Sequence, residues 1–109
     1  MDYQVRFSSE VKESLDNIYA FILQSAQSIE IADRVVSQLE YEMLGLSKDP
    51  TIWPYVHEFR DYGVRKAMLY DYIMPFIIDE DGKIVYVIDV FHGKSDYKWR
   101  IKESLEEIM

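Results

Sequence analysis

The sequence of 109 residues contains no cysteine, which excludes a disulfide framework, a thiolate nucleophile and a cysteine-based zinc site. Glycine is scarce as well, with four residues, and none belongs to a glycine-rich phosphate loop. The longest apolar runs, 72–78 and 84–88, are far too short to cross a bilayer. Met1–Arg6 lacks the apolar stretch of a signal peptide. We therefore expect a cytoplasmic protein with no role at the membrane.

The chain also has fewer basic than acidic residues. Lys and Arg total 12 and Asp and Glu total 20, which gives a net charge of −8. This acidity opposes broad, non-specific binding to nucleic acid. Residues 1–59 have a net charge of −6, whereas residues 60–102 have a net charge of +1 and hold most of the basic groups. The second half can therefore hold a local anion site, and ordinary solvated charges are the alternative.

Apolar side chains are abundant, at 49% of the chain, and they predict one folded domain over residues 1–109. Alternation over 3–7 predicts a half-buried strand. A helix is expected after the capping residues Ser8 and Ser9, with the apolar stripe Val11, Leu15, Ile18 and Ile22. After a loop over 24–28, a second helix is expected from Ser28 or Ile29, with the stripe Ala32, Val36, Leu39, Met43 and Leu46.

The second half predicts strands. A surface loop is expected over 47–62, followed by strands over 64–69, 72–78 and 84–91. Asp81-Gly82 indicates a hairpin between the last two, and Pro75 requires an edge, a bulge or a break. A last helix is expected over 96–108. The order β-α-α-β-β-β-α predicts an α+β fold, in which a helical hairpin covers one face of a small, largely antiparallel sheet.

Arg65 is the first candidate for a functional side chain. Arg65 and Lys66 are neighbours in a predicted strand, so they point to opposite faces of the sheet. The guanidinium of Arg65 suits a bidentate contact with phosphate or carboxylate. The alternative is a salt bridge within the fold, to Asp89 or Asp71.

His92 closes the last predicted strand, where functional groups are common. Its imidazole suits general acid–base work near neutral pH, Lys94 suits stabilisation of a developing phosphorane charge, and Tyr97 suits stacking on a base. The alternative for His92 is a structural hydrogen bond to nearby backbone. Two His with no Cys do not define a metal site, and the acidic run 79–82 is typical of a solvated turn, so no metal or cofactor is expected.

The order of elements and five local patterns resemble the RelE/ParE superfamily of bacterial toxins from type II toxin–antitoxin modules. The resemblance covers nearly the whole chain. The patterns are the first strand Tyr3–Ser8, the stripe Leu15, Ile18, Tyr19 and Ile22, the helix end Leu46–Pro50, the paired strands Gly63–Lys66 and Tyr72–Phe76, and the last strand Val87–His92.

The resemblance implies a small cytoplasmic toxin that inhibits growth, serves plasmid stabilisation and forms a hetero-oligomer with a cognate antitoxin protein. Ribonuclease branches of the family cleave mRNA on the ribosome without a metal, through the 2′-hydroxyl of the RNA, whereas the ParE branch poisons DNA gyrase. Arg65 matches an Arg at the start of the second strand, and His92 matches a His that ends the last one. Lys94 and Tyr97 fall where ribonuclease members keep basic and aromatic groups.

Three functions follow from this resemblance. The favoured hypothesis is a metal-independent endoribonuclease whose catalytic residues are Arg65, His92, Lys94 and Tyr97. The first alternative is a ParE-like gyrase poison, because Tyr72-Ile73 stands where ribonuclease members often have a further Arg. The second alternative is a module that binds an antitoxin and has no toxicity.

Overall fold

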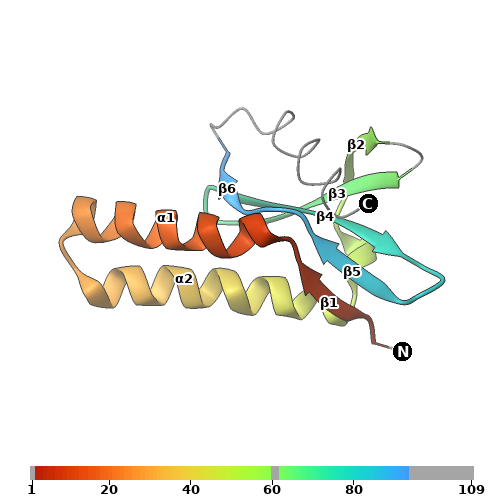
Figure 1. The fold of residues 1–109 in the computed structure, drawn as a ribbon, viewed down its shortest axis with the longest axis horizontal. Coiled ribbons are helices and arrows are strands. Elements are labelled where there is room, and N and C mark those ends of the chain that lie inside the picture. The colour runs from red at the N-terminus through yellow and green to blue at the C-terminus, as the bar shows by residue number, and fades with distance from the viewer. Residues whose placement is uncertain (1, 60–61, 94–109) are drawn as a thin grey trace.

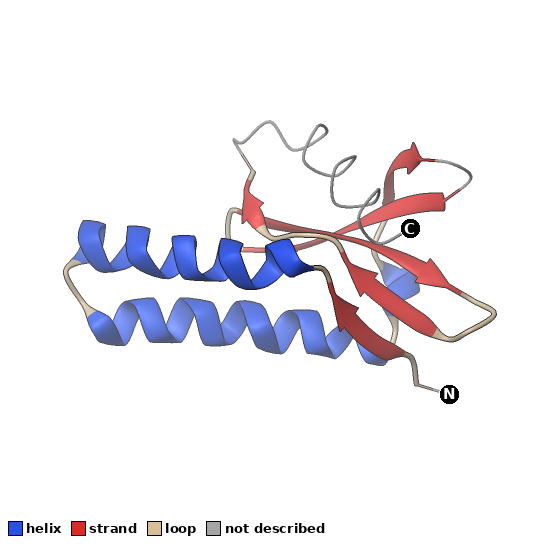
Figure 2. Ribbon diagram, viewed as in Figure 1, coloured by secondary structure: helices blue, strands red, loops and turns tan. Residues whose placement is uncertain are grey.

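Two long antiparallel helices project from one side of a twisted sheet in the computed structural model of the chain (Figure 1). The structure describes residues 2–59 and 62–93. Helices and strands form the α+β arrangement that the sequence predicts (Figure 2). The helix expected over 96–108 lies outside the described residues. Within the described ranges, no helix is both long enough and apolar enough to span a membrane.

The N-terminal half forms strand β1 (Gln4–Phe7) and helices α1 (Ser9–Ala26) and α2 (Ile29–Leu44). The predicted loop over 24–28 is too long, because α1 continues to Ala26. Its end is set by Gln27, which adopts the left-handed conformation with φ 52° and donates its N–H to Leu23 O at 2.9 Å. Ser28 then caps α2, since its hydroxyl accepts the N–H of Ile31 at 3.2 Å.

The second half forms the two short 3₁₀ helices η1 (Gly45–Ser47) and η2 (Pro50–Ile52), followed by five strands. These strands are β2 (Tyr55–Phe59), β3 (Tyr62–Leu69), β4 (Tyr72–Asp79), β5 (Ile84–Val87) and β6 (Phe91–His92). The order across the sheet is β1-β5-β4-β3-β2, and β6 pairs with β4 beyond the end of β5. The β1–β5 pair is parallel and the other four pairs are antiparallel, so the prediction of a largely antiparallel sheet is confirmed.

The loop predicted over 47–62 is wrong for residues 55–59, which form the edge strand β2. The register between β2 and β3 shifts between Tyr55 and His57. Such an irregularity adds a residue to one strand, so the apolar and polar residues no longer alternate with a period of two. Residues 55–59 therefore show no period of two in the sequence because they form a bulged strand, and not because they form a surface loop.

The strand predicted over 84–91 is interrupted, and Pro75 marks the interruption. Ile88 N–H donates to Pro75 O at 2.9 Å, after which the chain leaves the sheet until β6. The N and C=O of a strand residue point to the same side, so the nitrogen of Pro75 faces the gap between β5 and β6. Proline thus costs no ladder hydrogen bond, and β4 itself runs unbroken from Tyr72 to Asp79 inside the sheet, so the edge, bulge or break expected within this strand is wrong and the interruption lies in the neighbouring strand.

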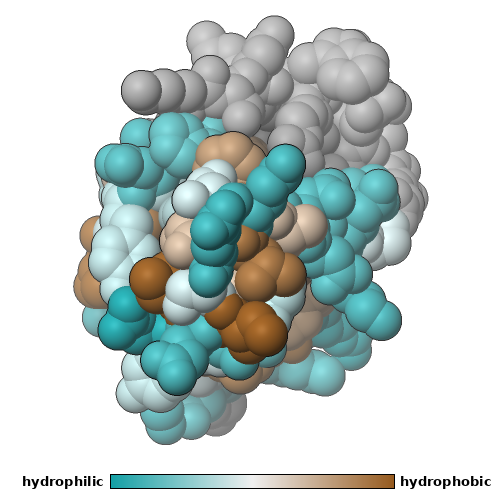
Figure 3. Space-filling model, turned by 90° about the vertical axis from the view of Figure 1, so that its left-hand side faces the viewer, coloured by the Kyte–Doolittle hydropathy of each residue, from teal (hydrophilic) through white to brown (hydrophobic). Residues whose placement is uncertain are grey.

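The core lies between the helical hairpin and one face of the sheet. Leu39 and Met43 of α2 are fully or almost fully buried against Phe76 of β4 and Val85 and Val87 of β5. The hairpin extends past the sheet (Figure 1). Apolar side chains are exposed on its far end (Figure 3), among them Phe21 at 65% and Ile29 at 62% of their surface.

Candidate functional site

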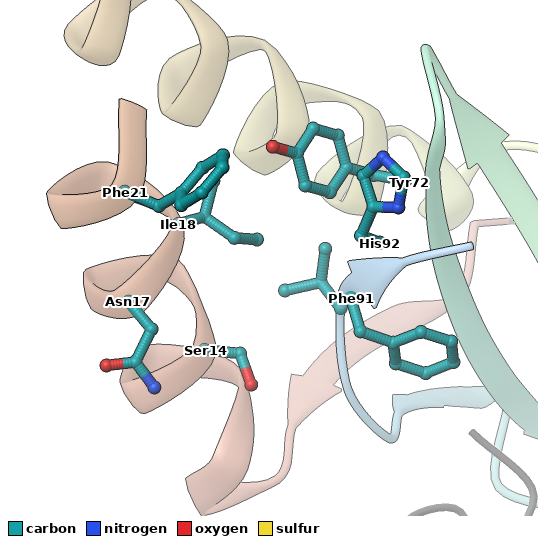
Figure 4. Close-up of a pocket in the computed structure, with 8 residues that line it drawn as sticks. Ser14, Asn17, Ile18, Phe21, Tyr72, Phe91 and His92 are labelled. Atoms are coloured by element: carbon teal, nitrogen blue, oxygen red, sulfur yellow. The ribbon is translucent and has the colours of Figure 1, made fainter. Parts of the chain in front are cut away.

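A pocket of about 360 Å³ separates α1 from the ends of β4 and β6 (Figure 4). Helix α1 contributes one wall and the sheet contributes the other. The residues around the pocket are Ser14, Asn17, Ile18, Phe21, Tyr72, Val90, Phe91 and His92. The pocket therefore contains His92, a candidate from the sequence, in a largely apolar setting.

His92 is placed by the pairing of β6 with β4. It lies opposite Tyr72 in the register, and the two rings meet edge to face with centroids 5.7 Å apart and planes at 82°. Gly93 N–H then donates to Asp71 O at 2.8 Å. A Cβ at Gly93 would lie 3.3 Å from that same oxygen, so this residue allows the close approach of the two backbones. The imidazole is thus held beside a phenol at the mouth of the pocket.

Tyr72 supplies that phenol. Burial raises the pKa of Tyr72 above its ordinary value of 10.0, and the nearby carboxylate of Asp71 raises it further. Tyr72 therefore stays neutral at physiological pH and remains a hydrogen-bond donor. Tyr72 is not among the catalytic candidates from the sequence, because nothing in a one-dimensional pattern shows that it faces His92.

The raised pKa of Tyr72 predicts a loss of stability in alkaline solution. The folded protein holds the phenolic proton more tightly than the unfolded chain, so this contribution is complete below pH 10 and is lost as the pH rises further. We expect Tyr72→Phe to lose less stability than the wild type between pH 9 and about 11. Urea unfolding at each pH measures the difference, and equal losses in both proteins would contradict the prediction.

A buried polar contact fixes the wall behind the pocket. Asp89 is fully buried in the segment between β5 and β6. Ser14 Oγ of α1 donates to Asp89 Oδ1 at 2.6 Å, and Val90 N–H donates to the same oxygen at 2.8 Å. Ser8 Oγ donates to Ile88 O beside them. The segment that carries His92 is therefore bound to α1 through side-chain hydrogen bonds.

Arg65 lies elsewhere, on β3 at the side of η2 and β2. Its Nη1 donates to Thr51 O at 3.2 Å and to Trp53 O, and its guanidinium lies 4.0 Å from the ring centroid of Tyr55. The alternative salt bridge from Arg65 to Asp89 or Asp71 is wrong, because these backbone carbonyls and the ring occupy the guanidinium instead. Arg65 thus ties the loop before β2 to the sheet.

Gly63 makes the stacking of Arg65 on Tyr55 possible. A Cβ at Gly63 would lie 2.2 Å from the ring of Tyr55, which crosses directly over this residue. Any larger side chain would displace the ring from its place beneath the guanidinium. The Gly63–Lys66 pattern in the sequence therefore has a structural reason here.

We expect Arg65→Ala to lower the free energy of unfolding by about 2 kcal/mol, because two charge-assisted hydrogen bonds and a cation–π contact are lost. Arg65→Lys should recover only part of this, since an ammonium cannot reproduce the planar fork. Urea unfolding measures both, with Lys66→Ala as the neighbouring control. An Arg65→Ala protein as stable as Lys66→Ala would contradict this role.

The structure does not bring Arg65 and His92 together. Arg65 lies opposite Phe76 on one side of β4, and His92 lies opposite Tyr72 on the other side. Four residues along β4 and two strand spacings separate their Cα atoms by about 16 Å. Lys94 and Tyr97 lie outside the described residues. Among the residues that are described, no group of three or more His, Asp or Glu could hold a metal ion.

The sequence matches a known protein family over most of its length. The model of the family described as ParE toxin of the type II toxin–antitoxin system parDE matches residues 5–97. The chain belongs to this family of toxins. The predicted membership of the RelE/ParE superfamily is thereby confirmed, and no curated protein sequence matches the toxin significantly.

The toxin also has the fold of solved toxin structures. It matches a chain of the chromosomal ParDE system from P. aeruginosa with a TM-score of 0.70 and 18% identity, over 83% of this chain and 95% of that one. It matches a chain of the RelBE2 toxin–antitoxin complex from Mycobacterium tuberculosis with a TM-score of 0.64 and 19% identity, over 84% and 92%. A mutant of E. coli toxin RelE in the free state gives 0.61 and 16%, over all of both chains.

These identities are low, so the likeness establishes a shared fold and no shared activity. Two of the three structures come from toxin–antitoxin systems in which the toxin has a protein partner. That observation supports an antitoxin as the partner of this toxin.

Proposed function

We propose that this toxin stops growth by binding a protein target, DNA gyrase, and not by cleaving mRNA. The observation that carries the proposal is the separation of Arg65 from His92, by about 16 Å along and across the sheet. Phosphate stabilisation and proton transfer must act on the same reacting group, within hydrogen-bond reach of it. Arg65, engaged by Thr51 O, Trp53 O and Tyr55, is also poorly placed to hold a phosphate.

The character of the pocket and of the surface supports a protein target. Around the pocket, the polar described side chains are a serine, an asparagine, a tyrosine and a histidine, and no Lys or Arg is among them. Helices α1 and α2 carry seven acidic and two basic side chains, which would repel RNA. Exposed apolar residues at the far end of the hairpin, such as Phe21 and Ile29, are typical of a protein-binding surface.

A metal-independent ribonuclease is the second candidate, and one observation favours it. His92 lies beside the neutral phenol of Tyr72 at the mouth of a pocket, which is a workable pair for proton transfer. In this mechanism Lys94 would stabilise the phosphorane and Tyr97 would stack on a base. Arg65 would not contact the reacting phosphate, so the positive charge that stabilises the phosphorane would have to come mainly from Lys94.

Induction of the toxin without its antitoxin separates the two functions. A gyrase poison should trigger the SOS response and trap DNA breaks while mRNA remains intact, and the purified toxin should inhibit supercoiling by purified gyrase. His92→Gln should then keep toxicity within about twofold, whereas loss of an acid–base catalyst would reduce cleavage by about 10²–10⁴-fold. Rapid mRNA cleavage with normal supercoiling would overturn the proposal, as would the absence of any growth arrest.

A further inference from the structure

The face of α1 that packs on the sheet continues beyond the end of the sheet. Ser14, Ile18 and Phe21 follow one another at spacings of four and three residues, so they share this face of the helix. Ser14 and Ile18 are 6% and 9% exposed, whereas Phe21 is 65% exposed. Figure 1 shows the reason, because α1 runs on past β4 and β6 there. Phe21 therefore presents its ring to solvent, where a partner can cover it.

Phe21 also forms one side of the pocket between α1 and the ends of β4 and β6. Val90 and Phe91 are its most buried members, and Tyr72 belongs to the wall on the side of the sheet. Figure 4 shows the hydroxyl of Tyr72 directed across the pocket towards the ring of Phe21. The pocket of about 360 Å³ thus has a buried apolar floor, an aromatic ring on each side and a neutral phenol that can donate a hydrogen bond.

The lining selects the chemistry of the group that can enter this pocket. No Lys or Arg is among the described residues of the lining, so a phosphate would meet no permanent positive charge on entering. An aromatic or large aliphatic side chain would instead leave water and gain apolar contacts with Phe21 and Ile18. Pockets of this kind hold the few residues that supply most of the binding energy in protein–protein interfaces. The pocket therefore suits an apolar side chain of a protein better than part of a nucleic acid.

The surface around the pocket is acidic. Helices α1 and α2 carry seven acidic and two basic side chains. Among them, Glu13 is exposed one helical turn before Asn17, which lines the pocket. Gyrase holds DNA, and the phosphates of DNA require a positively charged protein surface. Charge complementarity therefore favours gyrase, and opposes RNA, as the partner of this face.

We infer that Phe21 and this pocket form the docking surface for gyrase. A large apolar side chain of gyrase enters between Phe21 and Tyr72, and the phenol of Tyr72 donates a hydrogen bond to a polar atom beside it. Basic residues of gyrase meet the acidic side chains of α1 and α2. His92 contributes a wall that glutamine can replace, as the small effect expected for His92→Gln requires. The inference rests on the proposed function and names the part of the toxin that contacts gyrase.

Phe21→Ala tests the pocket, with Tyr41→Ala as its matched control. Both residues are exposed aromatic side chains of the helical hairpin, at 65% and 79% exposure, but Tyr41 does not line this pocket. With purified gyrase holoenzyme as the probe, we expect Phe21→Ala to weaken binding at least tenfold, because a central apolar contact is lost, and Tyr41→Ala by less than twofold. The toxin concentration that half-inhibits supercoiling should rise by the same factors. Urea unfolding should show that both variants are folded.

Asn17→Lys and Asn17→Glu test the charge of the partner. Asn17 is exposed on α1 at the rim of the pocket, so either side chain can be placed there without a change in the core. We expect Asn17→Lys to weaken binding to gyrase by about threefold to tenfold, because like charges then face each other, and Asn17→Glu to bind at least as tightly as the wild type. Equal effects of the two substitutions, or tighter binding by Asn17→Lys, would overturn the contact with a basic surface.

The wild-type toxin separates this inference from the proposal on which it rests. If the wild type neither binds gyrase nor inhibits supercoiling, the proposed function fails. If the wild type binds gyrase and Phe21→Ala binds it equally well, the proposed function stands and the docking surface is wrong. Loss of antitoxin binding by Phe21→Ala with unchanged gyrase binding would assign the pocket to the antitoxin instead. A dimer of the wild-type toxin that Phe21→Ala dissociates would assign it to a second copy of the chain, and either result would overturn the inference.

Discussion

Replacement of Asp89 by alanine is expected to lower the free energy of unfolding by about 3 kcal/mol, which corresponds to a fall in Tm of about 15 °C for a domain of this size. The carboxylate is fully buried and accepts from Ser14 Oγ at 2.6 Å and from Val90 N–H at 2.8 Å. Alanine leaves both donors inside the protein without their acceptor, and each buried donor without a partner costs about 1–3 kcal/mol.

A double-mutant cycle isolates the contact between α1 and the segment that carries His92. Ser14→Ala alone should cost about 1 kcal/mol, and the Ser14→Ala/Asp89→Ala protein should be more stable than the sum of the two losses predicts, by about 1 kcal/mol. Urea unfolding provides all three values. Asp71→Ala, at an exposed site, is the control and should cost less than about 0.5 kcal/mol. Additive losses would show that Ser14 and Asp89 do not act together.

The same change should affect the pocket before it unfolds the protein. The segment 88–90 holds β6 against β4 and so sets the contact of His92 with Tyr72.

Within the sequence, Asp89 is the one charged residue in the apolar run 84–91. A charge in such a run is a signal of a buried hydrogen-bonded group, but the run does not say which element supplies the partner. Ser14 lies 75 positions away, and only the packing of α1 on the sheet brings it there.

The fold was more predictable than the site because its signals are local. The stripes of both helices and the hairpin at Asp81-Gly82 each depend on neighbours in the chain. Strand β2 was not predicted, because its irregular pairing removes the period of two from the sequence. The parallel pairing of β1 with β5 was not predicted either, since it joins residues about 80 positions apart.

The candidate site depended on distances that a sequence does not contain. Arg65 and His92 were grouped because each lies at a characteristic place on its own strand. Whether two such residues meet depends on the register of β3 and β6 on β4, and here Phe76 and Tyr72 are the opposing residues. Neighbouring residues of any strand point to opposite faces of the sheet, so Arg65 and Lys66 were expected to do so from the sequence alone. Arg65 lies on the same face as Ala67, which packs in the core.

Phe76→Ala should have the largest effect on stability, about 4 kcal/mol. Phe76 is fully buried at the centre of β4, where it lies opposite Arg65 of β3 and Val87 of β5. Its ring fills the space between the sheet and the buried side of α2, and alanine would leave a cavity there. Phe21→Ala is the matched control, because the same residue type is 65% exposed in α1 and should cost less than about 1 kcal/mol.

The loss of stability in Phe76→Ala should be visible only when the toxin is not bound to the antitoxin. A domain of this size has a typical stability of about 5–15 kcal/mol, so a loss of 4 kcal/mol removes a large part of it. A partner that binds only the folded state, at a free concentration 1,000 times its Kd, raises the free energy of unfolding by about 4 kcal/mol. We therefore expect Phe76→Ala to accumulate as a folded complex with the antitoxin and to be degraded, and non-toxic, without it. Equal amounts of folded Phe76→Ala with and without the antitoxin would contradict this coupling, since binding to the native fold must raise the population of that fold.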